Sequence, residues 1–168
     1  AYLARRIGDM VGIPAFFVDP VCVDEMTDVA HYTGFADFRR LSQFHALNQK
    51  SIGRKAAAAL GRPYEQVNLI VCHLGGGVSV AAHHHGRVVD VFNVKDEGSM
   101  GMDRAGGLPV NQLIDYCYSG RSKDQIKKTL GRRAGMFSYL GTTDFRVICA
   151  KVTEGDPQFV EAYQALVY

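Results

Sequence analysis

The chain has 168 residues, of which 47% are hydrophobic and 21% are charged, and its formal net charge at pH 7 is +2. This length allows a substantial core, and this composition is typical of a globular protein rather than a disordered or fibrous one. The near-neutral charge gives no reason to expect a nucleic-acid partner, and no apolar run is long enough to cross a bilayer, so no membrane partner is expected.

The cysteines and the chain ends suggest a piece of a cytoplasmic protein. Four cysteines lie far apart without a C-x-x-C pair. Three of them, Cys72, Cys117 and Cys149, lie in apolar runs, which predicts buried, reduced thiols. Residues 1–11 are helical in pattern without a preceding cap, and residues 159–168 form an apolar helical pattern without a stop signal. We therefore expect an internal fragment of a longer protein.

The first third of the chain is predicted to be mainly helical. After the helix at 1–11, the apolar run 15–18 predicts a short buried strand that ends at Asp19. A carboxylate at the carboxyl end of a buried strand is a common place for chemistry, so Asp19 is a candidate site residue. Helices are predicted at 24–32 and 41–60. The acidic residues in the first turn of the 24–32 helix are explained more simply by a favourable interaction with the helix dipole than by a metal site.

A glycine-rich turn dominates the middle of the chain. The apolar run 68–74 leads into three consecutive glycines at 75–77, which remove every Cβ from the turn and let backbone N–H groups approach an anion such as phosphate. No helix and no Lys-Ser or Lys-Thr pair follows, unlike a Walker loop. Instead, strands are predicted at 78–82 and 87–92, joined by a turn at 83–86.

A meander with a glycine-rich first turn is the arrangement that binds the nucleotide phosphates in actin-like kinases. A tight hairpin without a ligand is the alternative, since glycine-rich turns are common in ordinary sheets. The next segment, 95–109, is too long for an ordinary connection, and long structured loops tend to be functional. Pro109 is expected to start a helix that ends at Tyr118. Shorter helices are predicted at about 122–130, 133–140, 143–153 and 156–168.

Histidines and one arginine are the remaining candidates. His45 lies in the predicted 41–60 helix beside apolar residues, where a core histidine is the simpler interpretation. Arg104 lies in the glycine-rich loop and could be a surface arginine. The triple histidine at 83–85 suggests a metal site, but neighbouring strand residues point to opposite faces, so a turn is favoured.

Taken together, these segments resemble the butyrate kinases, a branch of the acetate kinase family of actin-like phosphotransferases. The resemblance covers essentially the whole chain. A histidine followed by alanine favours the butyrate branch, because acetate kinases carry a glycine there. The motifs, in chain order, include IPAFFVDPV at 13–21, FHALNQK at 44–50, HLGGGVSV at 73–80, DRAGGLP at 103–109 and YLGTTD at 139–144.

The resemblance implies an α/β architecture, namely a partial actin-like (ribonuclease H-like) phosphotransferase fold with a three-stranded meander and surrounding helices. Residues 1–40 would end the first lobe, and residues 41–168 would form the start and middle of the second, nucleotide-binding lobe. The implied reaction is reversible transfer of the ATP γ-phosphoryl group to a short-chain carboxylate, butyrate or a branched relative, giving an acyl phosphate. An acetate or propionate kinase and a non-catalytic ATP-binding module are the alternatives.

The resemblance also implies residue roles. Asp19 matches the family's catalytic acid, and His45 and Arg104 match its transition-state stabilisers. The attacking carboxylate needs no general base, so we expect Asp19 to orient groups or a Mg²⁺-bound water. The cofactors would be ATP or ADP and Mg²⁺, with most Mg²⁺ ligands outside this chain and no metal ligand assigned within it. The full-length enzyme would be a homodimer. The implied nucleotide contacts are His73, Leu74, Gly75, Gly76, Gly77, Asp144, Phe145 and Arg146.

Residues 97–102 depart from the Gly-Pro-Phe-Ser pattern that is commoner among butyrate kinases. The resemblance therefore leaves the identity of the acyl chain open.

Overall fold

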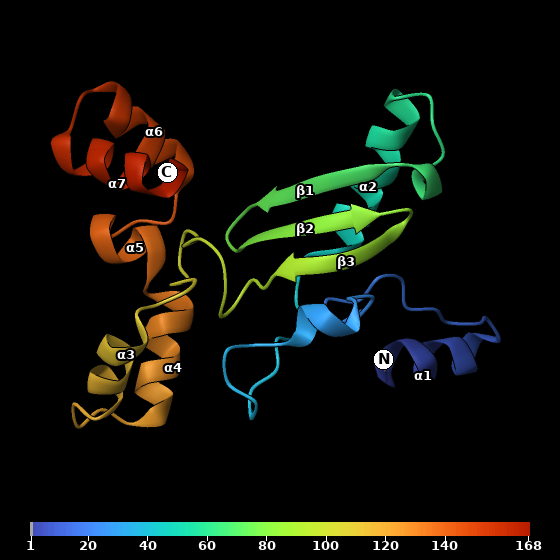
Figure 1. Ribbon diagram of the computed structural model, residues 1–168, viewed down its shortest axis with the longest axis horizontal. Coiled ribbons are helices and arrows are strands. Elements are labelled where there is room, and N and C mark those ends of the chain that lie inside the picture. The colour runs from blue at the N-terminus through green and yellow to red at the C-terminus, as the bar shows by residue number, and fades with distance from the viewer. Residues whose placement is uncertain (1) are drawn as a thin grey trace.

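The computed structural model describes residues 2–168 and shows an α/β arrangement in which a small sheet stands beside a group of helices (Figure 1). The antiparallel sheet has the order β1-β2-β3, with strands Asn68–Leu74, Val78–His84 and Arg87–Phe92. The predicted meander is therefore confirmed. In the β1–β2 ladder, His73 lies opposite Ser79, and residues 75–77 form the connecting turn.

The second turn is shorter than the sequence suggested. Only His85 and Gly86 separate β2 from β3, and both have positive φ, at 49° and 82°. Two residues with positive φ match the twist of a hairpin. His83 and His84 belong to β2 instead of the turn, because the His83 side chain finds a hydrogen-bond partner in the core and is only 2% exposed.

Helix α2, Ala46–Ala59, covers one face of the sheet (Figure 1). The helix was predicted to begin at residue 41, but it begins five residues later, at Ala46. The backbone of residues 43–44 hydrogen-bonds to Val21 and Val94 instead, which buries Phe44 to 1% exposure. The helix stops as predicted, with Gly61 at a φ of +67°. The 3₁₀ turn η2, Tyr64–Gln66, then leads into β1. The core here contains Met26, Phe44, Ala46, Ala81, Val88 and Val91.

The N-terminal segment differs most from expectation. Helix α1, Tyr2–Val11, is present, but the predicted strand at 15–18 is irregular and exposed, because no neighbouring strand among residues 2–168 pairs with it. The predicted 24–32 helix is reduced to the 3₁₀ turn η1, Asp28–His31. The backbone N–H of Thr27 donates to Val89 of β3, which takes this segment out of helical geometry.

The C-terminal third is helical, as predicted. Ser122 forms a capping box and Asp144 and Asp156 cap their helices, which explains why these helix starts were readable from the sequence. Met136, Ile148 and Ala162 form a second core. The helices are α3 (Val110–Cys117), α4 (Lys123–Arg132), α5 (Gly135–Leu140), α6 (Phe145–Thr153) and α7 (Pro157–Val167).

The expectation of buried thiols was wrong, since Cys72, Cys117 and Cys149 are all exposed, as is Cys22. Cys72 shows the reason, because the alternation of β1 places it on the side that the core does not cover. Within residues 2–168, no helix combines the length and the apolar character needed to span a membrane.

Candidate functional site

The glycine turn between β1 and β2 is open on one side and tightly packed on the other. A methyl group on Gly77 would lie 2.6 Å from the Val94 side chain, so any residue larger than glycine would force Val94 to move. A methyl group on Gly76 would meet no heavy atom within 4 Å. The Gly75 N–H donates to the Gly77 carbonyl at 3.2 Å. The backbone is therefore accessible at Gly76, as an anion-binding turn requires.

The long loop was predicted at 95–109; the structure has no helix or strand over 93–109, and this loop runs between the end of the sheet and the helices (Figure 1). Its Met102 N–H donates to the Gly76 carbonyl at 3.2 Å, and a methyl group on Gly101 would lie 2.9 Å from that oxygen. Glycine at 101 thus allows the loop to lie directly on the turn. This contact brings Arg104 to the site, where its Nη1 is 3.4 Å from the position of a methyl group on Gly77.

His45 reaches the same point from the other side. It immediately precedes α2 instead of lying within the helix, and its Cε1 is 3.5 Å from the position of a methyl group on Gly77. Its ring stacks on His73, with centroids 3.6 Å apart and planes 8° apart. Burial, followed by the neighbouring His73 ring and the Arg104 charge, lowers the pKa of His45. His45 is therefore a neutral group at the turn.

Arg104 supplies the positive charge. Its nearest carboxylate is Asp103, at 3.9 Å, which leaves most of the guanidinium available to an anion. Arg104 also lines a cavity of about 740 Å³ together with Lys95 and Lys127. The structure thus places the glycine turn, His45 and Arg104 side by side. Their spacing in the sequence could not predict this proximity.

Asp19 lies in a separate ionic cluster. Its Oδ1 is 3.6 Å from Lys50 Nζ and its Oδ2 is 3.7 Å from Arg54 Nη1, and this buried Oδ2 has no hydrogen-bond partner among residues 2–168. Lys50 also donates to Glu25 at 2.6 Å. Burial alone would raise the pKa of Glu25, but hydrogen bonds from Lys50 and the Val88 N–H outweigh it, so the pKa is lowered.

The backbone of Asp19 has a φ of 43°, which is strained for a residue with a Cβ. Lys50 and Arg54 lie on α2, so Asp19 is connected to the helix that follows His45. Within residues 2–168, its carboxylate makes no hydrogen bond or ion pair with His45 or Arg104.

The second predicted nucleotide contact lies at the start of α6. Asp144 caps this helix and pairs with the Arg146 side chain at 2.8 Å, which lowers the pKa of Asp144 to about 2. The Arg146 side chain is 92% exposed. Among the described residues, Arg146 has no hydrogen bond or ion pair with the glycine turn or Arg104.

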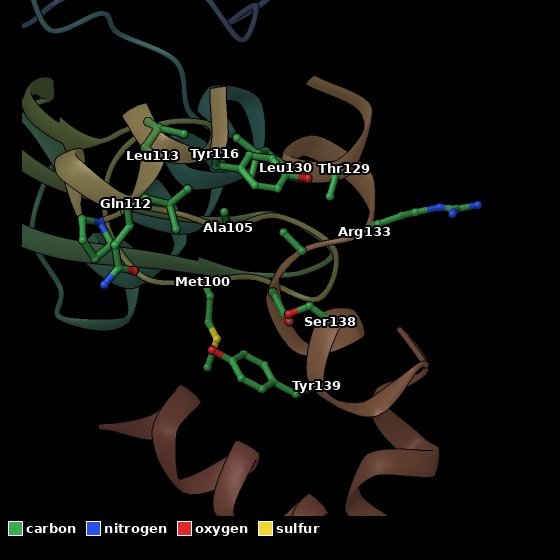
Figure 2. A pocket seen from close by; sticks show the side chains of 14 residues that line it. Met100, Ala105, Gln112, Leu113, Tyr116, Thr129, Leu130, Arg133, Ser138 and Tyr139 are labelled. Atoms are coloured by element: carbon green, nitrogen blue, oxygen red, sulfur yellow. Dashed lines mark hydrogen bonds between the residues drawn. The ribbon is translucent and has the colours of Figure 1, made fainter. Parts of the chain in front are cut away.

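An apolar cavity of about 340 Å³ lies on the helical side of the loop, between α3, α4 and α5. In Figure 2, Met100 and Tyr139 approach each other at one side of it, and Arg133 extends away. Neither His45 nor the glycine turn lines this cavity. Its lining is largely apolar, which does not suit a phosphate group.

Ser79 and Gln49 were not identified from the sequence. Ser79 Oγ lies 2.8 Å from His45 Nδ1, and the Gln49 amide donates to the same oxygen at 2.9 Å. The period-two alternation of β2 places Ser79 and His83 on one face, the face that α2 covers. Two polar residues on the buried face of a strand were the sequence signal that could have identified Ser79 as a candidate site residue.

Comparison with known proteins gives consistent matches. Residues 31–168 match the acetokinase family. The chain is 47% identical over 170 residues to a probable butyrate kinase of Listeria monocytogenes, aligned over the whole chain and 48% of that relative. It is 41% identical to butyrate kinase 1 of Clostridium acetobutylicum, over 99% of the chain and 47% of the relative. The chain thus spans about half the length of these curated relatives.

Solved structures share the fold. The chain superposes on acetate kinase from Porphyromonas gingivalis with a TM-score of 0.75 and on a propionate kinase from Francisella tularensis with a TM-score of 0.73. Each match has 22% sequence identity and covers 84% of this chain and 38% of the other. The α/β arrangement is therefore the one found in part of the actin-like acetate kinase fold.

Proposed function

The chain belongs to the acetokinase family, and we propose that it forms the phosphate-binding wall of a kinase that phosphorylates a short-chain carboxylate. The reaction is reversible transfer of the γ-phosphoryl group of ATP to butyrate or a branched relative, which yields an acyl phosphate. Identity of 41–47% to proteins named butyrate kinase favours this substrate class over acetate or propionate.

The observation that carries the proposal is the convergence of His45, Arg104 and an open glycine turn at one point. Phosphoryl transfer needs in-line positioning and donors to the equatorial oxygens, with little covalent help from the protein. Arg104 can bind two of these oxygens at once, and the His45 ring N–H can donate to a third. The acceptor carboxylate is already an anion, so no general base is required.

The nucleotide would be held at two places. We assign the phosphates to the turn formed by His73, Leu74 and Gly75–Gly77, whose open backbone at Gly76 suits an anion. We assign a second contact to Asp144–Arg146, where the exposed guanidinium can stack on the base as well as pair with phosphate.

The residues fit Mg²⁺ only in part. When bound, Mg²⁺ neutralises phosphate charge and prefers carboxylate and water oxygens. Residues 2–168 contain no group of three or more acidic, histidine or cysteine side chains placed to hold a metal ion. Asp19, with its buried unpartnered Oδ2, offers one oxygen, as a ligand or as an acceptor from a metal-bound water. The remaining ligands would come from the rest of the full-length protein, which we propose is a cytoplasmic homodimer.

The test is acyl-phosphate formation by the full-length protein, trapped as hydroxamate, with ATP, Mg²⁺ and acetate, butyrate or isobutyrate. His45→Ala and Arg104→Ala should each lower kcat about 100- to 1000-fold, the usual effect of removing one preorganised donor. Arg132→Ala, at the exposed end of α4, is the matched control. Loss of less than about threefold would refute the roles of His45 and Arg104. A wild-type protein inactive on every carboxylate would favour a nucleotide-binding module.

A further inference from the structure

A chain of buried hydrogen bonds runs from His45 into the core between α2 and the sheet. Its members are Ser79, Gln49, His83 and Tyr64, in that order. Ser79, Gln49 and His83 are each no more than 2% exposed, and Tyr64 is 6% exposed. Bulk solvent therefore does not reach these groups, and buried polar groups of this kind are generally paired within the protein.

The Gln49 amide determines which groups donate and which accept along this series of hydrogen bonds. Its Nε2 lies 3.1 Å from the Ser79 backbone carbonyl and 2.9 Å from Ser79 Oγ. Because a carbonyl oxygen can only accept, the NH₂ group must face Ser79. Gln49 Oε1 then faces His83 Nε2 at 3.4 Å, so His83 carries its hydrogen on Nε2.

The inner end of the chain agrees with this direction. His83 Nδ1 has no hydrogen in this tautomer and accepts from the Tyr64 hydroxyl at 2.6 Å. Burial lowers the pKa of His83 to about 4 and raises the pKa of Tyr64 to about 12. Both groups are therefore neutral near pH 7, as the assignment requires.

The outer end of the chain sets the state of His45. Ser79 Oγ accepts from Gln49, so its own hydrogen needs an acceptor. Among the described residues, that acceptor is His45 Nδ1, at 2.8 Å. A ring whose Nδ1 accepts carries its hydrogen on Nε2. The His45 atom beside Gly77 is Cε1, which is bonded to both ring nitrogens. Because Nδ1 is occupied by Ser79, Nε2 is the ring nitrogen that remains available to an anion at the turn.

We propose that Ser79 is a positioning residue that holds His45 as its neutral Nε2–H tautomer, with Gln49, His83 and Tyr64 fixing the direction of the Ser79 hydrogen bond. The ring then presents a donor to an anion at the glycine turn, whereas the other tautomer would present a lone pair and repel it. The identity of that anion as a phosphoryl group rests on the proposed function, but the tautomer does not.

The test combines a tautomer measurement with kinetics on the full-length protein. Long-range ¹H–¹⁵N correlation spectra of histidine-labelled protein distinguish the two ring nitrogens, with His45 assigned by the signals lost in His45→Gln. The wild type should show an unprotonated Nδ1. Ser79→Ala should mix the tautomers and lower kcat about tenfold, as loss of one hydrogen bond predicts, while KM for ATP and for carboxylate stays within about twofold.

Two further variants separate positioning from folding. Ser79→Cys keeps nearly the same volume but has only a weak donor, so it should show the same change of tautomer and kcat. Ser138→Ala removes a hydroxyl that bonds within α5 and is the matched control. A wild-type His45 with hydrogen on Nδ1, or an unchanged tautomer in both Ser79 variants, would overturn the proposal. An inactive wild type with the expected tautomer would refute the proposed kinase function alone.

Discussion

The tight side of the glycine turn allows a sharp test with one methyl group. In Gly77→Ala, the new Cβ would lie 2.6 Å from Val94 Cγ2, a distance that forces a shift, and near Arg104 Nη1 and His45 Cε1 at 3.4 and 3.5 Å. Val94 contributes the end of a side chain, so the fold should survive. Overpacking of this kind costs about 1–3 kcal/mol of unfolding free energy.

The effect on activity should exceed the effect on stability. The methyl group would lie in van der Waals contact with both Arg104 and His45 and would fill the space between these two donors, where we place the transferred phosphoryl group. We therefore expect kcat of the full-length protein to fall about 10- to 100-fold. The hydroxamate assay measures kcat, and denaturant unfolding measures stability. Gly131→Ala is the matched control, because its methyl meets nothing within 4 Å and a helix gains about 0.5–1 kcal/mol from alanine.

The reasoning would be refuted if Gly77→Ala kept at least half of the wild-type kcat. That result would mean that the phosphoryl group does not bind in the space between Gly77, His45 and Arg104. A fall in kcat for Gly131→Ala of the same size would show instead that the assay responds to general changes in the fold.

Three other predictions address the nucleotide, the core and the loop. Arg146→Ala should raise KM for ATP more than it lowers kcat, and steady-state kinetics showing the reverse would contradict stacking on the base. The pKa of His83 is about 4 in the folded state and about 6.5 in the unfolded state, so below pH 6.5 only the unfolded state takes up a proton there. The unfolding free energy, measured by denaturant titration, should therefore fall by up to about 3 kcal/mol between pH 7 and 4. His83→Gln should lose this pH dependence. Arg40→Met should lower the unfolding free energy by about 2–3 kcal/mol, because Arg40 forms ion pairs with Asp90 and with Glu97 of the 93–109 loop. Arg39→Met, which changes an exposed arginine, should be near neutral in the same unfolding assay.

Local signals explain which elements could be predicted. The meander was readable because two apolar runs flank three glycines, and the C-terminal helices were readable because Pro109 and the caps Ser122, Asp144 and Asp156 mark their starts. The run 15–18 has the composition of a strand, but a strand needs a neighbour, and none of the described residues pairs with it. The sequence pattern therefore predicted these elements where the hydrogen-bond partners are close in sequence, and failed for the 15–18 run, whose strand partner would have to be distant in sequence.

The site shows the same limit. The glycine turn was predictable because its chemistry lies in consecutive residues. The convergence of His45 and Arg104 was not, since it depends on Met102 and Gly101 folding back onto Gly76 across a gap of about 25 residues in the sequence. Only the resemblance to a known family placed those two side chains together beforehand.

The buried polar chain has a physical consequence for how stability and activity are connected. A polar network in a core is tolerable only when every member is satisfied, because one missing partner leaves a costly unpaired group. Here Gln49 makes its bonds to Ser79 and His83 simultaneously, so neither end can change without affecting the other. The same bonds that satisfy the core set the hydrogen on Ser79 and, through it, the ring of His45. Substitutions at the inner end, far from the glycine turn, should therefore act on the site through hydrogen-bond direction rather than through displacement of the backbone.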